Sequence, residues 1–95
     1  MFKELDPLLH SQLRLAIVAA LITVEEAEFT WLQDQTGASA GNLSVQLNKL
    51  KEAGYIGIEK SFRGNYPRTL CRMTVLGKDK FREYVEILKE YIDQK

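Results

Sequence analysis

Two glycines, Gly37 and Gly54, bound the segment that most constrains how this chain folds. Glycine readily adopts the left-handed conformation that ends helices, so each of these positions marks a helix end. Ser39 is a favoured N-cap residue, and leucines then recur at spacings of four and three, at positions 43, 47 and 50. The pattern predicts one amphipathic helix over residues 40–53, with its leucines facing the core.

A shorter helix is predicted immediately before Gly37. Thr30 with Gln33 fits a capping box, and Phe29 is placed to act as a hydrophobic staple against the first turn. The helix would end at Gly37, which leaves only residues 36–39 to join it to the next helix. Two short helices with such a link form a helix-turn-helix.

Two further helices are predicted near the ends of the sequence. Asp6 is placed to cap, and Pro7 to begin, a helix over residues 7–22 that is apolar on two sides. One side would face the core and the other a second subunit. Thr74 is expected to cap a last helix, 75–92, whose apolar stripe contains Leu76, Phe81, Tyr84, Val85, Leu88, Tyr91 and Ile92.

Two strands are predicted between these helices, over residues 55–62 and 69–73, because inward apolar residues alternate with other residues there. Gly64 and Asn65 indicate a turn, and Pro67 is expected to keep the intervening segment out of a regular ladder. A further, very short strand near residues 28–30 is compatible with the pattern. The order helix-helix-helix-strand-strand-helix predicts a mainly α fold with a small β-hairpin (α+β), a single winged helix-turn-helix domain over residues 1–95.

The charge of the chain is unevenly distributed although its net charge is zero. Residues 39–72 contain six basic and two acidic residues, whereas residues 1–38 contain two basic and six acidic residues. Nucleic acid responds to local positive charge more than to the total. The basic block therefore favours a nucleic-acid partner, with chance clustering as the alternative.

Several kinds of chemistry are not expected. One cysteine, Cys71, and one histidine, His10, are too few for a disulfide within the chain or a Cys/His zinc site, so no metal and no cofactor is predicted. No nucleophile with a base, paired carboxylates or phosphate-binding glycine loop is recognisable, so the protein is not expected to be an enzyme. No apolar run approaches about 20 residues, so we expect a cytoplasmic protein without a membrane partner.

Two isolated residues have alternative interpretations. Cys71 lies at an inward strand position, where an inert buried thiol is favoured over a redox sensor because no basic neighbour in sequence activates it. His10 lies beside an apolar face, where a pH switch is the less favoured alternative to a structural role.

The chain resembles small prokaryotic winged-helix regulators related to the MarR group. The resemblance lies in residues 43–56, similar to the recognition helix and its exit, in residues 60–69, similar to the wing, and in residues 73–78, similar to the start of the last helix. It implies DNA binding and a homodimer whose terminal helices form much of the interface. Larger relatives carry extra helices that build a ligand pocket, so the resemblance identifies no small-molecule effector here.

The residues predicted to contact double-stranded DNA lie on the second helix of the motif and on the hairpin. Val45 and Asn48 lie opposite the buried leucines, where a valine methyl can touch thymine and an asparagine amide can pair with adenine. The alternatives are an ordinary solvated helix face and a hairpin charged to discourage edge pairing. The predicted DNA contacts are Ser39, Ala40, Gly41, Asn42, Ser44, Val45, Asn48, Lys49, Lys60, Arg63, Asn65, Tyr66 and Arg68.

A dimer seam is predicted on the terminal helices 7–22 and 75–92, although their aromatic residues also suit the core. The residues assigned to it are Leu9, Leu13, Tyr84, Leu88, Tyr91 and Ile92. The sequence thus predicts a homodimeric, sequence-specific DNA-binding transcriptional regulator. A winged-helix module that binds protein and not DNA is the alternative, because one fold hosts both roles.

Overall fold

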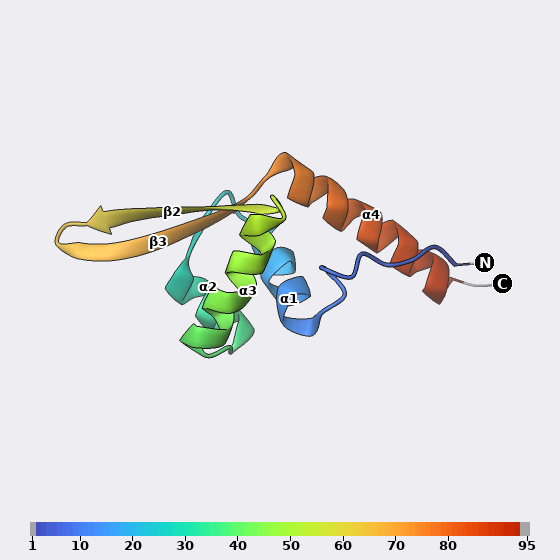
Figure 1. Cartoon of the computed structure of the whole chain (residues 1–95), viewed down its shortest axis with the longest axis horizontal. Helices are drawn as coiled ribbons and strands as arrows, with labels where there is room; N and C mark the ends of the chain where they lie inside the picture. The colour runs from blue at the N-terminus through green and yellow to red at the C-terminus, as the bar shows by residue number, and fades with distance from the viewer. Residues whose placement is uncertain (1, 94–95) are drawn as a thin grey trace.

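The computed structural model describes residues 2–93, which form four helices and one three-stranded antiparallel sheet (Figure 1). In chain order these are α1 (Gln12–Leu21), β1 (Ala27–Glu28), α2 (Phe29–Thr36), α3 (Ala40–Glu52), β2 (Ile56–Arg63), β3 (Tyr66–Met73) and α4 (Val75–Ile92). The predicted fold class and order are confirmed. The very short strand is present as β1, which adds an edge to the hairpin in the sheet order β1-β3-β2.

The molecule is elongated, with extents of 57 × 25 × 21 Å. Helices α1, α2 and α3 form a body from which the β2–β3 hairpin projects to one side and α4 to the other (Figure 1). The N-terminal segment runs beside α4, where the Phe2 ring stacks on Tyr91 and the Tyr91 hydroxyl donates to the Lys3 carbonyl oxygen at 2.7 Å. The turn of the hairpin thus lies at one end of the elongated molecule, and the end of α4 lies at the other (Figure 1).

The core lies where α1, α2, α3 and the inner end of the sheet meet. The leucine stripe predicted on α3 is confirmed, because Leu43, Leu47 and Leu50 are all buried. Each such side chain contributes about 1.5–3 kcal/mol relative to an exposed one. Fully buried partners come from the other elements: Leu9, Ile17, Val18, Leu21, Leu32 and Cys71. This packing fixes the rotation of α3 and leaves its opposite side outward.

The first helix begins five residues later than predicted, at Gln12. Ser11 has extended dihedral angles (φ −149°, ψ 129°), and its N–H donates to the Leu9 carbonyl oxygen at 2.8 Å, so the chain bends before the helix. Asp6 caps the preceding turn instead, because its Oδ1 accepts from the Leu8 N–H at 2.9 Å. The bend also turns Leu9 into the core.

The capping box predicted at Thr30 and Gln33 is wrong. Helix α2 starts at Phe29, and its N-cap is Glu28, whose side chain makes no capping hydrogen bond. The reason is the strand β1, because Glu28 pairs with Leu70 of β3 and the chain passes from strand to helix without a loop. The carboxylate of Glu28 is consequently available for other partners.

The other helix boundaries agree closely with prediction. Gly37 ends α2 and Gly54 follows α3, with φ of 71° and 82°. The Ser39 hydroxyl accepts from the Asn42 N–H at 3.2 Å, and the Thr74 hydroxyl accepts from the Gly77 N–H at 3.0 Å. The helix-turn-helix is thereby confirmed, although its link is residues 37–39, since Thr36 still belongs to α2, and α3 ends at Glu52.

Strand β3 is longer than predicted because Pro67 does not interrupt the ladder, and β2 is shifted by one residue from its predicted range. Pro67 pairs with Phe62, and only Gly64 and Asn65 form the turn, with a φ of 61° at Gly64. In a two-residue hairpin the closing pair, here Arg63–Tyr66, is hydrogen-bonded, and hydrogen-bonded and non-hydrogen-bonded pairs alternate from there. The next pair, Phe62–Pro67, is therefore not hydrogen-bonded, and the proline nitrogen faces away from β2. No ladder bond is lost there.

Gly77 allows α4 to pack tightly against the end of α3. A Cβ at this position would overlap the Tyr55 carbonyl oxygen and approach the Met73 Cε to 2.8 Å. The same junction is held by the Thr74 hydroxyl, which donates to the Gly54 carbonyl oxygen at 2.6 Å. The inner end of the sheet is therefore fixed to both α3 and α4.

Candidate nucleic-acid interface

The outward side of α3 is small and polar. Even the apolar Val45 is 52% exposed. All the DNA contacts predicted on this side are exposed: Ser39, Ala40, Gly41, Asn42, Ser44, Val45, Asn48 and Lys49. A Cβ on Gly41 would meet nothing within 4 Å. The side offers hydroxyl, amide and ammonium groups around one apolar side chain, which suits the mixed edges of DNA bases.

A hydrogen-bonded chain orients the start of this side. Arg14 of α1 donates from Nη1 to the Gln46 Oε1 at 2.6 Å, and Gln46 Nε2 donates to the Asn42 Oδ1 at 3.2 Å. Arg14 is itself held by the Leu8 carbonyl oxygen, 2.6 Å from its Nε. No local sequence pattern predicts these contacts, because Arg14 and Gln46 are 32 residues apart.

The hairpin presents a mixed cationic and aromatic tip. Arg63 and Tyr66 face each other across the turn, and the tyrosine is 79% exposed. Lys60 and Asn65 are also exposed, as predicted. Phe62, which was not predicted as a contact, is 71% exposed; its outward position is explained by the strand continuing past the end of the core.

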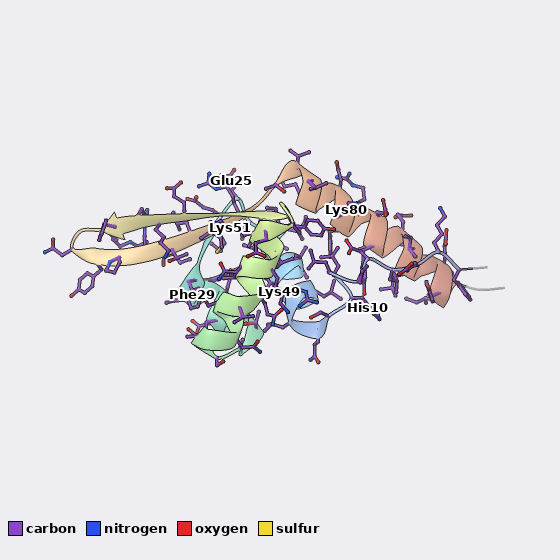
Figure 2. All side chains as sticks on the ribbon, viewed as in Figure 1. His10, Glu25, Phe29, Lys49, Lys51 and Lys80 are labelled. Atoms are coloured by element: carbon purple, nitrogen blue, oxygen red, sulfur yellow. The ribbon has the colours of Figure 1, made fainter. Side chains whose placement is uncertain are left out.

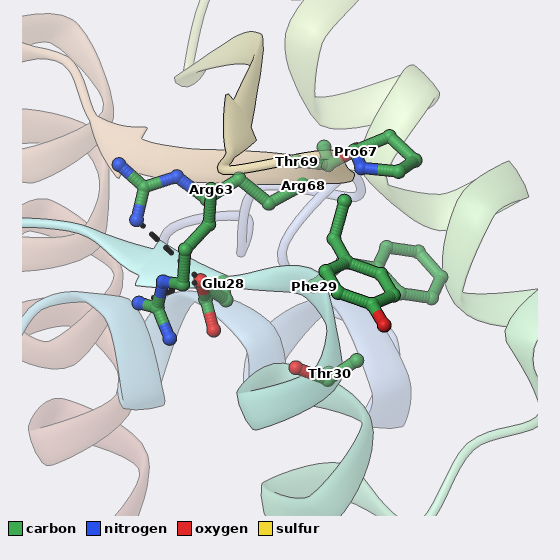
Figure 3. Close-up of a pocket in the computed structure, with 8 residues that line it drawn as sticks. Glu28, Phe29, Thr30, Arg63, Pro67, Arg68 and Thr69 are labelled. Atoms are coloured by element: carbon green, nitrogen blue, oxygen red, sulfur yellow. Dashed lines mark ion pairs between the residues drawn. The ribbon is translucent and has the colours of Figure 1, made fainter.

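Arg63 and Arg68 have different surroundings although both were predicted as contacts. The Arg63 side chain is 71% exposed, and its Nη2 lies 3.2 Å from the Glu28 Oε1. The Arg68 side chain is 33% exposed, lies 3.6 Å from the same oxygen, and donates from Nε to the Ser61 Oγ at 3.1 Å. Figure 3 shows both guanidinium groups directed at Glu28 beside the start of α2. Arg63 is thus the more accessible cation.

Acidic residues from the N-terminal half offset part of the basic block. Arg72 contacts Glu26 at 3.1 Å and Glu59 at 3.3 Å, so this cluster at the inner end of the sheet has more negative than positive charge. Within residues 2–93, Lys49, Lys51 and Lys60 make no ion pair; Figure 2 labels Lys49 and Lys51 on α3. Within the basic block, residues 39–72, the lysines without an ion pair therefore lie on α3 and along the outer hairpin.

The residues assigned to a dimer seam differ in burial and fall into three groups: buried, half-buried and exposed. Leu9 and Tyr84 are buried in the core of the single chain, and the Tyr84 hydroxyl lies 3.0 Å from the His10 Nδ1, so these two side chains offer no surface to a partner. Leu13 and Leu88 are half-buried against the core. Ile92 is 72% exposed, and Tyr91 is half-buried beneath the N-terminal segment.

The remaining chemistry-bearing residues are structural or inaccessible. Cys71 is fully buried, and burial raises the pKa of its thiol to about 11, as an inert thiol requires. No group of three or more His, Cys, Asp or Glu side chains in the described part of the chain is arranged to hold a metal ion. Among the same residues, no helix is both long and apolar enough to cross a bilayer.

Comparison with known proteins agrees with this geometry. An uncharacterized protein of Methanocaldococcus jannaschii is 33% identical over 81 residues, which cover 84% of this chain and 88% of that protein. The solved structure of a transcriptional regulator homologue from Pyrococcus horikoshii superposes with a TM-score of 0.85 at 27% identity, covering 90% of this chain and 85% of the other.

More distant structures share the fold. PadR of Bacillus subtilis, solved in complex with operator DNA, has a TM-score of 0.70 at 18% identity over 79% of this chain and 48% of its own. A MarR family regulator from Silicibacter pomeroyi has a TM-score of 0.68 at 19% identity, over 83% and 52%. The predicted likeness to the MarR group is confirmed for the fold. The sequence model of the family "winged helix DNA-binding domain" matches residues 13–92, and the chain belongs to that family.

Proposed function

We propose that this protein binds double-stranded DNA in a sequence-specific manner and regulates transcription as a homodimer. In this proposal α3 enters the major groove, and the wing, defined as residues 60–69, contacts the adjacent backbone or minor groove. The observation that carries the proposal is the pairing of an exposed, polar α3 side with a projecting hairpin whose Arg63 and Lys60 are open to phosphates. Membership of the DNA-binding family supports it.

The reading role is assigned to the middle of α3. Asn48 and Val45 project from the side opposite the buried leucines, so both are free to reach base edges in a major groove. Ala40 and Gly41 are small and allow the first turn to approach the duplex closely. Ser44 and Lys49 flank this surface and are positioned for bases or phosphates.

The phosphate role is assigned to the outer hairpin. Arg63, Lys60 and Asn65 are exposed around the turn, and Tyr66 presents its ring beside them. An arginine at such a tip is able to enter a minor groove or to contact phosphates. Arg68 is held within the hairpin by Ser61 and Glu28, so its contribution to DNA contact is smaller than that of Arg63.

A homodimer would place two α3 helices about 34 Å apart, one helical turn of DNA. We assign the seam to the exposed end of α4 around Ile92, with Leu88 and Tyr91 beside it, and to Leu13 of α1. Ile92→Asp is expected to give monomers by light scattering. Val75→Asp is the control, because Val75 is 76% exposed at the opposite end of the same helix. A dimer that persists in Ile92→Asp would move the seam elsewhere.

Selection from a random pool of duplexes tests the reading function directly. Purified protein should enrich a pseudo-palindrome whose half-sites are centred 10–10.5 base pairs apart, as two-fold docking requires. Asn48→Ala protein is expected to enrich the same sequence with one position relaxed. A pool that stays random after several rounds would overturn sequence-specific binding and would favour a protein-binding module.

A further inference from the structure

The outer hairpin has little support from the rest of the fold. Strand β1 pairs with β3 only at Ala27–Cys71 and Glu28–Leu70, so the sheet has three strands at its inner end and two strands beyond it. The outer pairs run from Lys60–Thr69 to the turn and project past the helical body (Figure 1). A two-stranded ribbon of this kind is marginally stable by itself.

Glu28 lies where this support ends. It is the last residue of β1 and the N-cap of α2, yet its carboxylate does not cap the helix. Glutamate is not a favoured N-cap residue, so helix capping does not explain the residue at this position. Its side chain is 32% exposed and is directed at the hairpin (Figure 3).

One oxygen of Glu28 contacts both wing arginines. Its Oε1 lies 3.2 Å from the Arg63 Nη2 and 3.6 Å from the Arg68 Nη1. Arg68 also donates to Ser61 on the neighbouring strand, so β1, β3 and β2 are joined by one set of polar contacts. Among the described residues, these are the ion pairs that join the outer hairpin to the helical body.

We propose that Glu28 is the positioning residue of the wing: it holds Arg63 and the outer hairpin at one angle to the helix-turn-helix. This inference rests on the proposed function. Because Glu28 is continuous with α2, the angle of the wing is set directly by the helix pair that carries the reading surface. Glu28 faces both guanidinium groups and offsets part of their combined charge, while Arg63 remains the more exposed of the two cations.

Ion pairs between exposed groups add little to the stability of a fold, so the effect of Glu28 is expected in selectivity and not in folding. A correctly angled wing favours the duplex whose bases α3 reads. A freely moving wing contacts the phosphates of any duplex equally well. Loss of Glu28 should therefore reduce the ratio of specific to non-specific affinity without reducing non-specific affinity.

The test compares Glu28→Gln with Glu26→Gln. Both variants remove one carboxylate from the same acidic segment, but Glu26 contacts Arg72 at the supported inner end of the sheet. Anisotropy titrations would use the duplex selected by the wild-type protein and a random duplex of about 30 base pairs, at several salt concentrations. Thermal unfolding would confirm that both variants fold.

In Glu28→Gln the affinity ratio is expected to fall about fivefold to tenfold, which lies within the range that two such ion pairs supply together. Its random-duplex affinity should stay equal or rise, with a salt slope at least as steep as that of the wild type, because a carboxylate has been removed. Glu26→Gln should keep the ratio within about twofold. Amide exchange of residues 60–69 should quicken in Glu28→Gln alone.

Two results would overturn the inference while the proposed function stands. The first is a Glu28→Gln ratio equal to that of the wild type, and the second is an equal loss in Glu26→Gln, which would indicate a general charge effect. Wild-type protein that binds neither duplex would overturn the proposed function and this inference together.

Discussion

The two halves of the β2–β3 hairpin differ in almost every physical respect. At the inner end, Ile56, Cys71 and Met73 are buried, β1 adds a third strand, and Arg72 forms ion pairs with two carboxylates. At the outer end, Phe62 and Tyr66 are more than two-thirds exposed, and two strands stand alone. One continuous pair of strands thus serves as core at one end and as surface at the other.

The difference shows how a small domain combines a rigid core with a hairpin that projects beyond it. Apolar burial holds the inner end because it is non-directional and requires close packing. The outer end has no core to bury, so polar contacts with Glu28 set its direction at small energetic cost. Mutations at the two ends are therefore expected to act on different properties: stability at the inner end and DNA binding at the outer end.

The largest effect is expected at the inner end, in Gly77→Ala. The added Cβ would overlap the Tyr55 carbonyl oxygen, so α4 must shift away from the end of α3. Overpacking of this kind costs about 1–3 kcal/mol of unfolding free energy, measured by urea denaturation. Gly41→Ala is the control, because its Cβ meets open space. A Gly77→Ala protein as stable as the wild type would contradict the tight junction.

The next effect is expected on α3, in Asn48→Ala. Binding to the selected duplex should weaken by about 1–3 kcal/mol, whereas binding to random duplex should be unchanged, because a base contact is lost and no charge is removed. Paired anisotropy titrations measure both affinities. An equal loss on both duplexes would exclude a base-reading role for Asn48.

A smaller effect is expected at the outer end, in Arg63→Ala. Affinity for random duplex should fall, and the slope of log affinity against log salt should become shallower by about 0.9, the loss of one phosphate contact. Affinity for the selected duplex should fall at least as much, because Glu28 also loses one of its two contacts with the wing. Stability should stay within about 0.5 kcal/mol of the wild type, because the side chain is largely exposed. A salt slope identical to that of the wild type would remove Arg63 from the interface.

The smallest effect is expected at Cys71 in neutral solution. With a pKa of about 11, roughly one thiol in 10⁴ is ionised at pH 7, so a thiol reagent should not react until the protein unfolds. Because the unfolded thiol ionises near pH 9, this group reduces stability as pH rises from 9 towards 11. Rapid labelling of the native protein at pH 7 would contradict a sealed inner end.

Local signals in the sequence predicted the helical framework well. The glycines at 37 and 54 and the caps Ser39 and Thr74 act through their own backbone, so they are visible without tertiary structure. The exposed side of α3 followed from the leucine spacing alone. Where a tertiary contact competed with a local signal, the prediction failed: pairing of Glu28 with Leu70 displaced the capping box at Thr30.

The sequence predicted which residues form the candidate site, but it did not predict the ion pairs that their charges make. A count of charges along the chain separates the acidic and basic segments, whereas folding places Glu28 against Arg63 and Arg68. The prediction treated these two arginines as equivalent, and only the structure distinguishes the exposed one from the partly buried one. Leu9 and Tyr84 were assigned to a seam because helical spacing does not tell the core side from a partner side.

DNA binding by α3 and the wing is tested by titrating folded wild-type protein into a labelled random duplex of about 30 base pairs between 50 and 200 mM salt. We expect micromolar binding that falls steeply as salt rises, because lysines and arginines of α3 and the wing displace counterions. Folded protein that fails to bind at 50 mM salt would contradict the account.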